Sequence, residues 1–435
     1  MLSLPSEEGV ELLLGLVDQD LDSPDNSRLL AQTLVNQLGG LPLAINQMAS
    51  FMVVSGCGLE DFLEMFSDCR DREQLISEDS TDTNISYPHS LQTVWEMSMS
   101  RISKANADSA HILQIMALYD PDSIPERLLL GSKSQGNGNA EFSRLKYLES
   151  KLKFFNATKP LLQQSLVMKD QAQQAFSMHR LVGAITLSKI ETGEKQARFD
   201  EALELLYRVY PRLTLKKALL NDAWPSCRLY LPHVVSLERY YRESESPLLP
   251  RAKFATVLAN ASWFLFEQGL PSQALQILPT ARQVGEATLS GNEEAVATIY
   301  RAYGAIYLDA NKPQEAFDNF SRQLNILQNI GSPDDLVVAH GYNNVALAQV
   351  ALGQYESAKT NYQRAIDIRN KYPGEGEGYK ALTLLNMATL EGLRHEYEKA
   401  LPKFREAIEL FDRDQGVGNY MTASYVFSPN HHFIC

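Results

Sequence analysis

The sequence has little cysteine and no long apolar run, and each absence excludes a class of protein. The four cysteines among 435 residues are scattered and form no Cys-X-X-Cys pair: Cys57, Cys69, Cys227 and Cys435. We therefore expect neither a disulfide scaffold nor a cysteine-based zinc site, and free thiols in a reducing compartment. No apolar stretch of about 18 residues occurs, so no membrane span is expected. The acidic N-terminus lacks the basic start of a secretory signal, which favours a cytoplasmic location.

An excess of positive charge is also missing. Lys and Arg number 40 against 53 Asp and Glu, which gives a formal net charge of −13. A net acidic chain without a basic run is a poor binder of nucleic acid or of an anionic membrane. Hydrophobic residues make up 44% and charged residues 21%, which are ordinary values for a globular protein. We therefore expect neither nucleic acid nor a membrane as a partner, and self-association is left open.

The motifs of common catalytic sites are absent as well. The pattern GxxxxGK[ST] is not found, and the dipeptide Gly-Lys does not occur at all. Phosphoryl transfer needs a glycine-rich loop, a lysine on the phosphates and a carboxylate on the magnesium ion. Neither a nucleophile elbow nor a zinc helix with two histidines is present. We therefore expect no enzyme activity, no catalytic residue and no metal site in this chain.

A repeated pattern of small and large residues dominates the C-terminal half. Four alanines follow one another at intervals of 42 residues: Ala274, Ala316, Ala358 and Ala400. A large side chain stands four residues after each of them: Leu278, Phe320, Tyr362 and Phe404. A small residue stands twelve residues before each: Ser262, Gly304, Ala346 and Ala388. Small residues let antiparallel helices approach closely while the large side chain fills the next gap, so the spacing predicts four helical hairpins.

The residues five positions before these alanines mark the turn within each hairpin. They are Gly269, Asn311, Gly353 and His395. Gly and Asn readily adopt the left-handed conformation that ends a helix, whereas His does so less readily. We therefore expect the turn between the two helices of each hairpin at these positions. Pro271, Pro313, Tyr355 and Tyr397 follow two residues later.

This small–large–small spacing over about residues 254–417 resembles the tetratricopeptide repeat. The 42-residue period is similar to the longer repeat of kinesin light chains, and a generic helical solenoid is the alternative. The resemblance implies an α-solenoid with a protein or peptide in its groove. The residues expected at or near that groove are Asn260, Trp263, Arg301, His340, Asn343, Asn344 and Asn386. Asparagine can bridge an extended peptide backbone, but these asparagines can equally cross-link adjacent helices.

The N-terminal half carries a second set of signals. Leu30, Leu34 and Leu38 lie on one face of a predicted helix, and Gly39-Gly40 ends it. Pro42 then opens the next helix, which places Gly-Leu-Pro-Leu-Ala (residues 40–44) at a tight elbow. A polar linker is predicted over 71–89, followed by two helices near 91–102 and 112–119, a loop over 131–140 and a short hairpin at 165–169 and 174–178. Met-His-Arg (residues 178–180) opens a further helix.

Helices followed by a small hairpin suggest a winged-helix unit. The order Gly-Leu-Pro-Leu-Ala, winged helix, Met-His-Arg and repeat array resembles the C-terminal half of the NB-ARC module in fungal-type regulatory ATPases of the STAND (NLR-like) group. That resemblance implies that Pro42 lines an adenine site and that His179 contacts a phosphate of bound ADP, as vestigial contacts here. Arg180 replaces the family's aspartate. No cofactor is expected for this chain, and ADP or ATP only if an upstream phosphate loop exists.

The predicted fold class is therefore mostly all-α. We expect an NB-ARC-like helical part (1–70), a winged-helix-like domain (71–192), degenerate helical repeats capping the array (193–253), four tetratricopeptide repeats (254–417) and a truncated half-repeat or tail (418–435). The predicted function is that of a regulatory interaction module, a fragment of an NB-ARC–tetratricopeptide signalling sensor. A stand-alone repeat adaptor, of the kinesin-light-chain or co-chaperone type, and a nucleotide-switch ATPase whose phosphate-loop half is missing are the alternatives.

Overall fold

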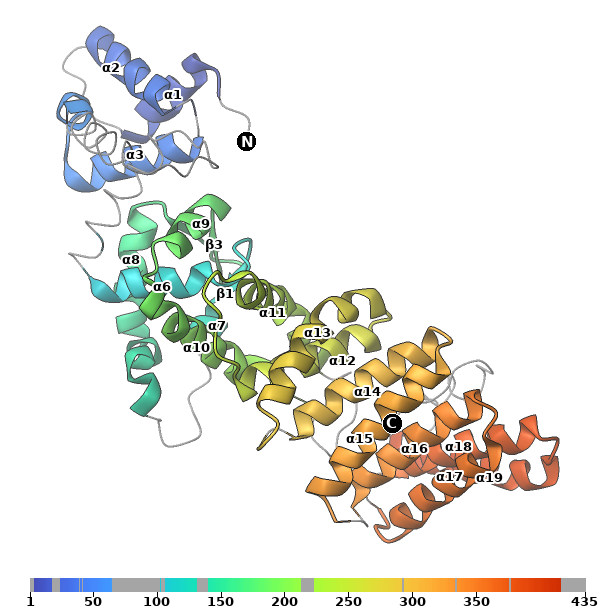
Figure 1. Cartoon of the computed structure of the whole chain (residues 1–435). Coiled ribbons are helices and arrows are strands. Elements are labelled where there is room, and N and C mark those ends of the chain that lie inside the picture. Colours follow the sequence, from blue (N-terminus) through green and yellow to red (C-terminus); the bar gives the residue numbers. More distant parts are fainter. Residues whose placement is uncertain are drawn as a thin grey trace. The chain divides into compact units, whose positions relative to one another are not determined.

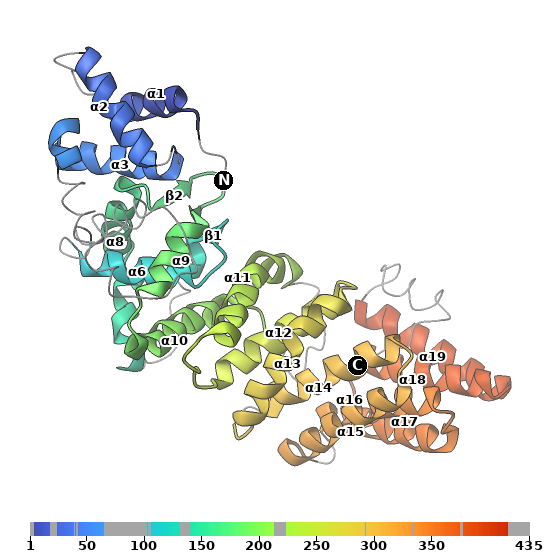
Figure 2. The same ribbon diagram turned by 45° about the horizontal axis from the view of Figure 1, so that its top comes forward.

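The structure is a computed structural model of the chain and describes residues 4–17, 24–38, 40, 42–64, 102, 106–130, 140–212, 223–291, 293–332, 335–374 and 377–415. The chain forms two compact units, residues 1–209 with 244–248, and residues 210–243 with 249–435. Figures 1 and 2 show that the described chain is mostly helical. The predicted linker over 71–89 and the half-repeat at 418–435 lie outside the described residues, and so do almost all of the helix at 91–102 and the loop at 131–140.

Three helices at the start of the chain pack around one apolar core. They are α1 (Ser6–Val17), α2 (Pro24–Gln37) and α3 (Pro42–Ser55). Leu34 and Leu38 of the predicted apolar face are fully buried in this core, together with Ile45 and Met48 of α3. Gly40 has a φ of 64°, and α3 begins at Pro42 two residues later, which confirms the elbow. The left-handed glycine ends one helix and the proline, preset for a first turn, begins the next.

A small mixed unit follows in the order helix, strand, three further helical segments, hairpin and helix. Its elements are α6 (Ala107–Ala117), β1 (Ile124–Pro125), α7 (Glu126–Leu130), the 3-10 segment η1 (Ala140–Glu149), α8 (Lys151–Gln163), β2 (Val167–Asp170), β3 (Ala175–Met178) and α9 (Arg180–Ser188). The three strands form an antiparallel sheet in the order β1-β3-β2. This is the arrangement of a winged-helix unit, with the hairpin displaced by one or two residues from its predicted position.

The helix that follows belongs to the same compact unit. Helix α10 (Thr192–Val209) packs on α6 and α7, whereas α11 (Trp224–Glu243) packs on α12 and α13 of the second unit. The prediction that residues 193–253 form one cap on the repeat array is therefore wrong for α10. The apolar face of α10 includes Phe199, Leu203 and Leu206, all buried. It carries no repeat signature, so sequence spacing alone did not assign it to the winged-helix side.

Four helical hairpins make up the rest of the second unit. They are α12 (Ala252–Glu267) with α13 (Pro271–Ala287), α14 (Glu293–Asp309) with α15 (Pro313–Ile330), α16 (Leu336–Ala351) with α17 (Tyr355–Asn370), and α18 (Glu377–Leu393) with α19 (Tyr397–Gln415). Consecutive hairpins stack side by side in both ribbon views. Each second helix begins two residues after the predicted turn position.

The close approach of the helices follows the predicted register. The four spaced alanines are buried, and so are Ser262, Ala346 and Ala388 on the facing helices. All four predicted turn positions have positive φ, from 55° at Asn311 to 72° at Gly353. His395 adopts this conformation too, with a φ of 61°. The hairpin geometry therefore overrides the weaker intrinsic preference of histidine.

A second repeated contact joins three helices at a time, and the sequence reading missed it. Arg322 of α15 lies over the ring of Tyr300, and Arg364 of α17 lies over the ring of Tyr342, each 5.6 Å from the ring centroid. The hydroxyl groups of the two tyrosines are held by the preceding hairpin. Tyr300 donates to Glu286 at 2.5 Å, and Gln328 donates to Tyr342 at 3.0 Å. All three positions recur after 42 residues, so successive hairpins are tied by the same polar contact.

Gly304 provides the sharpest test of this register. A Cβ atom at this position would stand 2.5 Å from two ring carbons of Phe320 on the paired helix. Gly304→Ala should therefore overpack the crossing and lower the free energy of unfolding by about 1–3 kcal/mol. Gly392→Ala is the matched control, since a Cβ there meets no atom within 4 Å. It should be neutral or stabilising by up to about 1 kcal/mol. Chemical denaturation measures both, and equal effects would refute the proposed crossing.

Candidate functional site

The residues predicted for the groove gather on the first helices of the hairpins, but inside the array. A buried polar cluster lies where the third and fourth hairpins meet. Its members are Gln323, His340, Asn343, Asn344, Arg369, Thr383 and Asn386, all buried. We call this set the polar cluster.

 The cluster thus joins four helices, namely α15 of the second hairpin, both helices of the third and the first helix of the fourth.

Hydrogen bonds within the polar cluster run from one hairpin to the next. The side-chain oxygen of Asn343 accepts from Thr383 and from Asn386 of α18, each at 3.1 Å. The amide nitrogen of Asn343 donates to Asn344 at 3.3 Å, and that of Asn344 donates to Gln323 at 3.1 Å. The amide groups are therefore used to connect neighbouring helices.

Two charged or chargeable side chains complete the polar cluster. Arg369 donates to Thr383 and, at 3.2 Å, to Nδ1 of His340. Burial lowers the pKa of His340 well below its ordinary value, and the nearby charges of Arg369 and Arg301 lower it further. The imidazole is therefore neutral at pH 7 and can accept from the guanidinium group. The ring of Tyr379 packs edge-on against it, with 4.6 Å between the centroids.

This geometry corrects the prediction of groove-facing residues. Asn343 and Asn344 have no exposed surface, and the other five are at most 9% exposed: Asn260, Trp263, Arg301, His340 and Asn386. Trp263 does not line an open pocket, because the guanidinium of Arg301 covers its ring at 3.6 Å and its Nε1 donates to Glu267. Asn343, Asn344 and Asn386 instead cross-link adjacent helices, which is the alternative given in the sequence analysis. Direct partner contact by these residues remains a prediction, and their burial argues against it.

The two residues linked to nucleotide by resemblance lie in the first unit. Pro42 is the first residue of α3 and is half-buried, and His179 is the N-cap of α9. Nδ1 of His179 accepts from the backbone N–H of Leu181 at 3.2 Å. Burial lowers the pKa of His179, so a neutral ring suits this capping role. Leu181 packs against the core of α1–α3, so the first turn of α9 lies against the bundle that contains Pro42.

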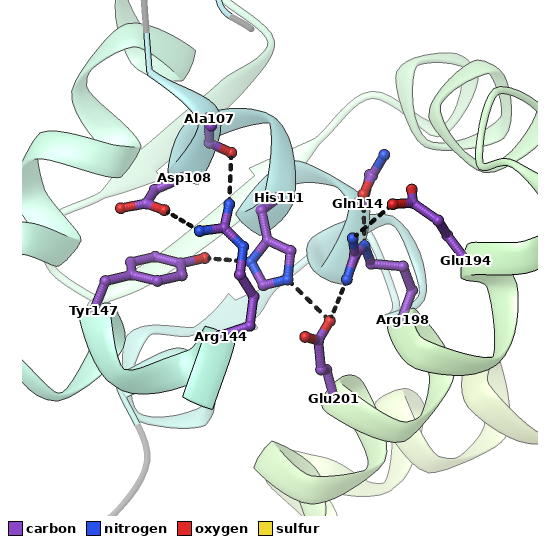
Figure 3. A network of polar contacts seen from close by, with 9 residues as sticks. All are labelled: Ala107, Asp108, His111, Gln114, Arg144, Tyr147, Glu194, Arg198 and Glu201. Atoms are coloured by element: carbon purple, nitrogen blue, oxygen red, sulfur yellow. Dashed lines mark hydrogen bonds and ion pairs between the residues drawn. The ribbon is translucent and has the colours of Figure 1, made fainter. Parts of the chain in front are cut away.

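A buried polar network joins the winged-helix unit to α10 (Figure 3). Nε2 of His111 on α6 lies 2.9 Å from a carboxylate oxygen of Glu201 on α10, and its Nδ1 lies 2.9 Å from the hydroxyl of Tyr147. Arg198, one turn before Glu201, donates to that carboxylate at 2.7 Å and to Gln114 of α6 at 2.7 Å. We call His111, Gln114, Tyr147, Arg198 and Glu201 the coupling network.

The charges of the coupling network keep Glu201 ionised. Burial raises the pKa of this carboxyl group, but hydrogen bonds from His111 and Arg198 and the positive charge of Arg198 outweigh burial, and the pKa lies below its ordinary value. A buried carboxylate that accepts from both an imidazole and a guanidinium holds two helices in one register. The network therefore fixes α10 on α6. Sequence reasoning missed it, because 90 residues separate His111 from Glu201.

Across the described ranges, no helix combines the length and hydropathy that crossing a membrane requires. In the same part of the chain, no three His, Cys, Asp or Glu side chains gather as ligands for a metal ion.

Comparison with protein-family models gives two matches. Residues 337–413 match the tetratricopeptide repeat, and residues 100–195 match a domain of unknown function (DUF7779). The first match covers the third and fourth hairpins, and the same register runs through all four. The array is a tetratricopeptide solenoid. The second match covers the winged-helix unit and the start of α10.

Similar proteins include one curated relative and two solved structures. The relative is a "Nucleotide-binding leucine-rich repeat (NLR)-like protein" of Hyaloscypha variabilis, 26% identical over 228 residues, which are 50% of this chain and 21% of the relative. This chain therefore spans about a fifth of that relative's length. The match agrees with the NLR-like resemblance indicated by the motifs of the N-terminal half.

The two solved structures are more distant. BtubC (BKLC) from P. vanneervenii is 16% identical with a TM-score of 0.39, covering 52% of this chain and 86% of that one. The second structure is a Signal Transduction ATPase with Numerous Domains (STAND) protein with a tetratricopeptide repeat sensor, from Pyrococcus horikoshii. It is 14% identical with a TM-score of 0.32, covering 97% of this chain and 62% of that one. Both TM-scores lie below 0.5, so neither likeness by itself defines the fold.

Asn343 tests whether the polar cluster is structural. Asn343→Ala removes the acceptor shared by Thr383 and Asn386 and leaves both donors buried. The free energy of unfolding of the tetratricopeptide array should fall by about 1–3 kcal/mol. Asn329→Ala is the matched control, since the amide of this exposed residue donates to Asn325 of the same helix, and it should cost under about 0.5 kcal/mol. A variant as stable as the wild type would show that Asn343 does not join the hairpins.

Glu201 tests the coupling network through its pH dependence. Glu201→Gln removes the carboxylate from His111 and Arg198 and should destabilise the first unit by about 3 kcal/mol at neutral pH. Because the folded pKa of Glu201 is depressed, its contribution is complete above the unfolded-state pKa and is lost as the pH falls through the folded value. The difference between wild type and variant should therefore shrink below about pH 4. Urea unfolding at several pH values measures it.

Glu194→Gln is the matched control for this experiment. Glu194 is on the same helix and pairs with Arg198 at 3.5 Å, but its side chain is 49% exposed. Its loss should cost under about 1 kcal/mol, with little dependence on pH. Equal costs for the two substitutions would contradict the role assigned to Glu201.

Proposed function

We propose that this chain is the regulatory and sensor part of an NB-ARC (STAND, NLR-like) signalling protein. In this proposal the tetratricopeptide array binds a protein or peptide partner, and the winged-helix unit belongs to the switch that the partner controls. The observation that carries the proposal is the joint presence, on one chain, of a winged-helix unit ending in Met178-His179 and a tetratricopeptide array. The similarity to an NLR-like protein over half of the chain supports it. A cytoplasmic location would suit this role.

The coupling network supplies a physical route for such control. Helix α10 is the last helix of the first unit, and the chain enters the second unit directly after it, at Tyr210. The contacts of Arg198 and Glu201 with α6 attach α10 rigidly to the winged-helix unit. A change in the array that pulled on α10 would therefore act on α6 through buried charged groups. Breaking such contacts is costly, which favours a two-state response.

Two other functions differ from this proposal in defined ways. A stand-alone adaptor needs only the tetratricopeptide array and gives no role to the α1–α3 bundle and the winged-helix unit. An active nucleotide switch needs a phosphate loop, and the 435 residues contain no Gly-Lys pair. We propose that Pro42 and His179 are at most one side of a nucleotide site, with ADP or ATP bound only if a phosphate loop precedes them in a longer protein. Micromolar binding of ADP to this chain would favour the nucleotide switch.

Hydrogen exchange on the partner-bound chain tests the proposed function. The full chain is immobilised and used to purify a partner from an extract, and the complex is then analysed by mass spectrometry. Partner binding should slow amide exchange in the array over residues 252–415. If partner signals pass through α10, exchange should also change in 192–209. Protection confined to residues 4–190, with the array unaffected, would contradict a sensor role for the repeats.

A further inference from the structure

The surface of α8 combines large apolar side chains with positive charge. Leu152 and Phe155 are 70% and 56% exposed, which places them among the most exposed large apolar residues of the described chain. Lys151, Lys153 and Lys159 of the same helix are exposed too. Figure 2 shows α8 beside α6 in the winged-helix unit. Neither the coupling network nor the tetratricopeptide array uses these side chains.

The exposed residues form one face of the helix. Leu152 and Phe155 are three positions apart, and Lys159 follows four positions after Phe155, so the three lie along one stripe. The opposite face is buried and holds Phe154, Ala157 and Leu161. Phe154 packs edge-on against Phe176 of β3, with 5.9 Å between the centroids. Because this buried face anchors α8, the exposed stripe is presented on a fixed support.

Two of the positive charges on α8 stand at the end of the helix where the helix dipole disfavours them. Lys151 and Lys153 stand in the first turn, where the partial positive charge of the helix end disfavours cations. The helix carries no Asp or Glu, although the whole chain has a net charge of −13. Glu149, just before the N-cap Ser150, is the nearest exposed acid along the chain. A local arrangement that opposes stability is expected where a surface serves recognition.

We propose that the exposed stripe of α8 binds an acidic amphipathic helix of a partner protein. The apolar side of that helix would cover Leu152 and Phe155, and its carboxylates would face Lys151, Lys153 and Lys159. Apolar anchors spaced at three to four residues are the mark of helix-in-groove recognition. Nucleic acid fits less well, because phosphates would use the three lysines only and leave the two apolar side chains exposed.

Binding of a designed probe tests the proposal directly. The probe is a fluorescein-labelled peptide of about 15 residues, with Leu and Phe on one helical face and Glu elsewhere. Fluorescence anisotropy with the full chain should show saturable binding that weakens as salt is added. The pair Lys151→Glu with Lys153→Glu should lower the affinity at least about tenfold, and so should the pair Leu152→Ala with Phe155→Ala. Failure of the wild type to bind the probe would overturn the proposal.

The stability of the charge-reversal variant separates recognition from folding. Glutamate in the first turn suits the helix dipole, so this variant should be as stable as the wild type or more stable while it binds the probe less well. Lys312→Glu with Lys371→Glu, and Leu401→Ala, are matched controls at exposed sites of the second unit and should change affinity less than about twofold. Tighter binding of duplex DNA or of anionic vesicles than of the peptide would also overturn the proposal. So would unchanged affinity in both α8 variants.

Discussion

The second unit depends on a steric constraint at each helix crossing, where there is room for almost no side chain. The ring of Phe320 fills the space that a methyl group at Gly304 would need, and Ala346 and Ala388 are fully buried at the equivalent positions of the next two hairpins. Once the helices approach this closely, the hairpins must stack in one register. The paired contacts of Arg322 with Tyr300 and of Arg364 with Tyr342 then recur at the same spacing. Close packing thus sets the positions that the polar contacts occupy.

The same constraint explains which features could be predicted. A crossing needs small residues at fixed positions in every hairpin, so the same pattern occurs four times in the sequence. The positions of the turns at Gly269, Asn311, Gly353 and His395 follow from that pattern. The burial of Asn343 and Asn344, by contrast, could not be predicted from the repeat pattern. Asn343 is held by Thr383 and Asn386, about 40 residues away, and Asn344 by Gln323 of the preceding hairpin. A spacing pattern identifies the helix that carries a residue, but not what covers its side chain.

The division between the two units also could not be predicted from the sequence. Helices α10 and α11 both read as irregular helical segments before the repeats, yet α10 packs on the winged-helix unit and α11 on the array. The distinction comes from a few buried polar partners, above all Glu201 with His111 and Arg198. Polar pairs of this kind contribute specificity to packing because an unsatisfied charge is costly to bury. Apolar periodicity alone does not distinguish two possible packing partners for one helix.

We infer that α10 is a fixed part of the winged-helix unit, and that the chain continues from the end of α10 into the second unit. Native-state hydrogen exchange of the full chain tests the claim most directly, because it reports which segments open together. The account predicts that amides of α10 (192–209) exchange with the same opening free energy as those of α6 (107–117), and that Glu201→Gln lowers both together. Exchange of α10 in step with α12 and α13, independent of α6, would contradict it.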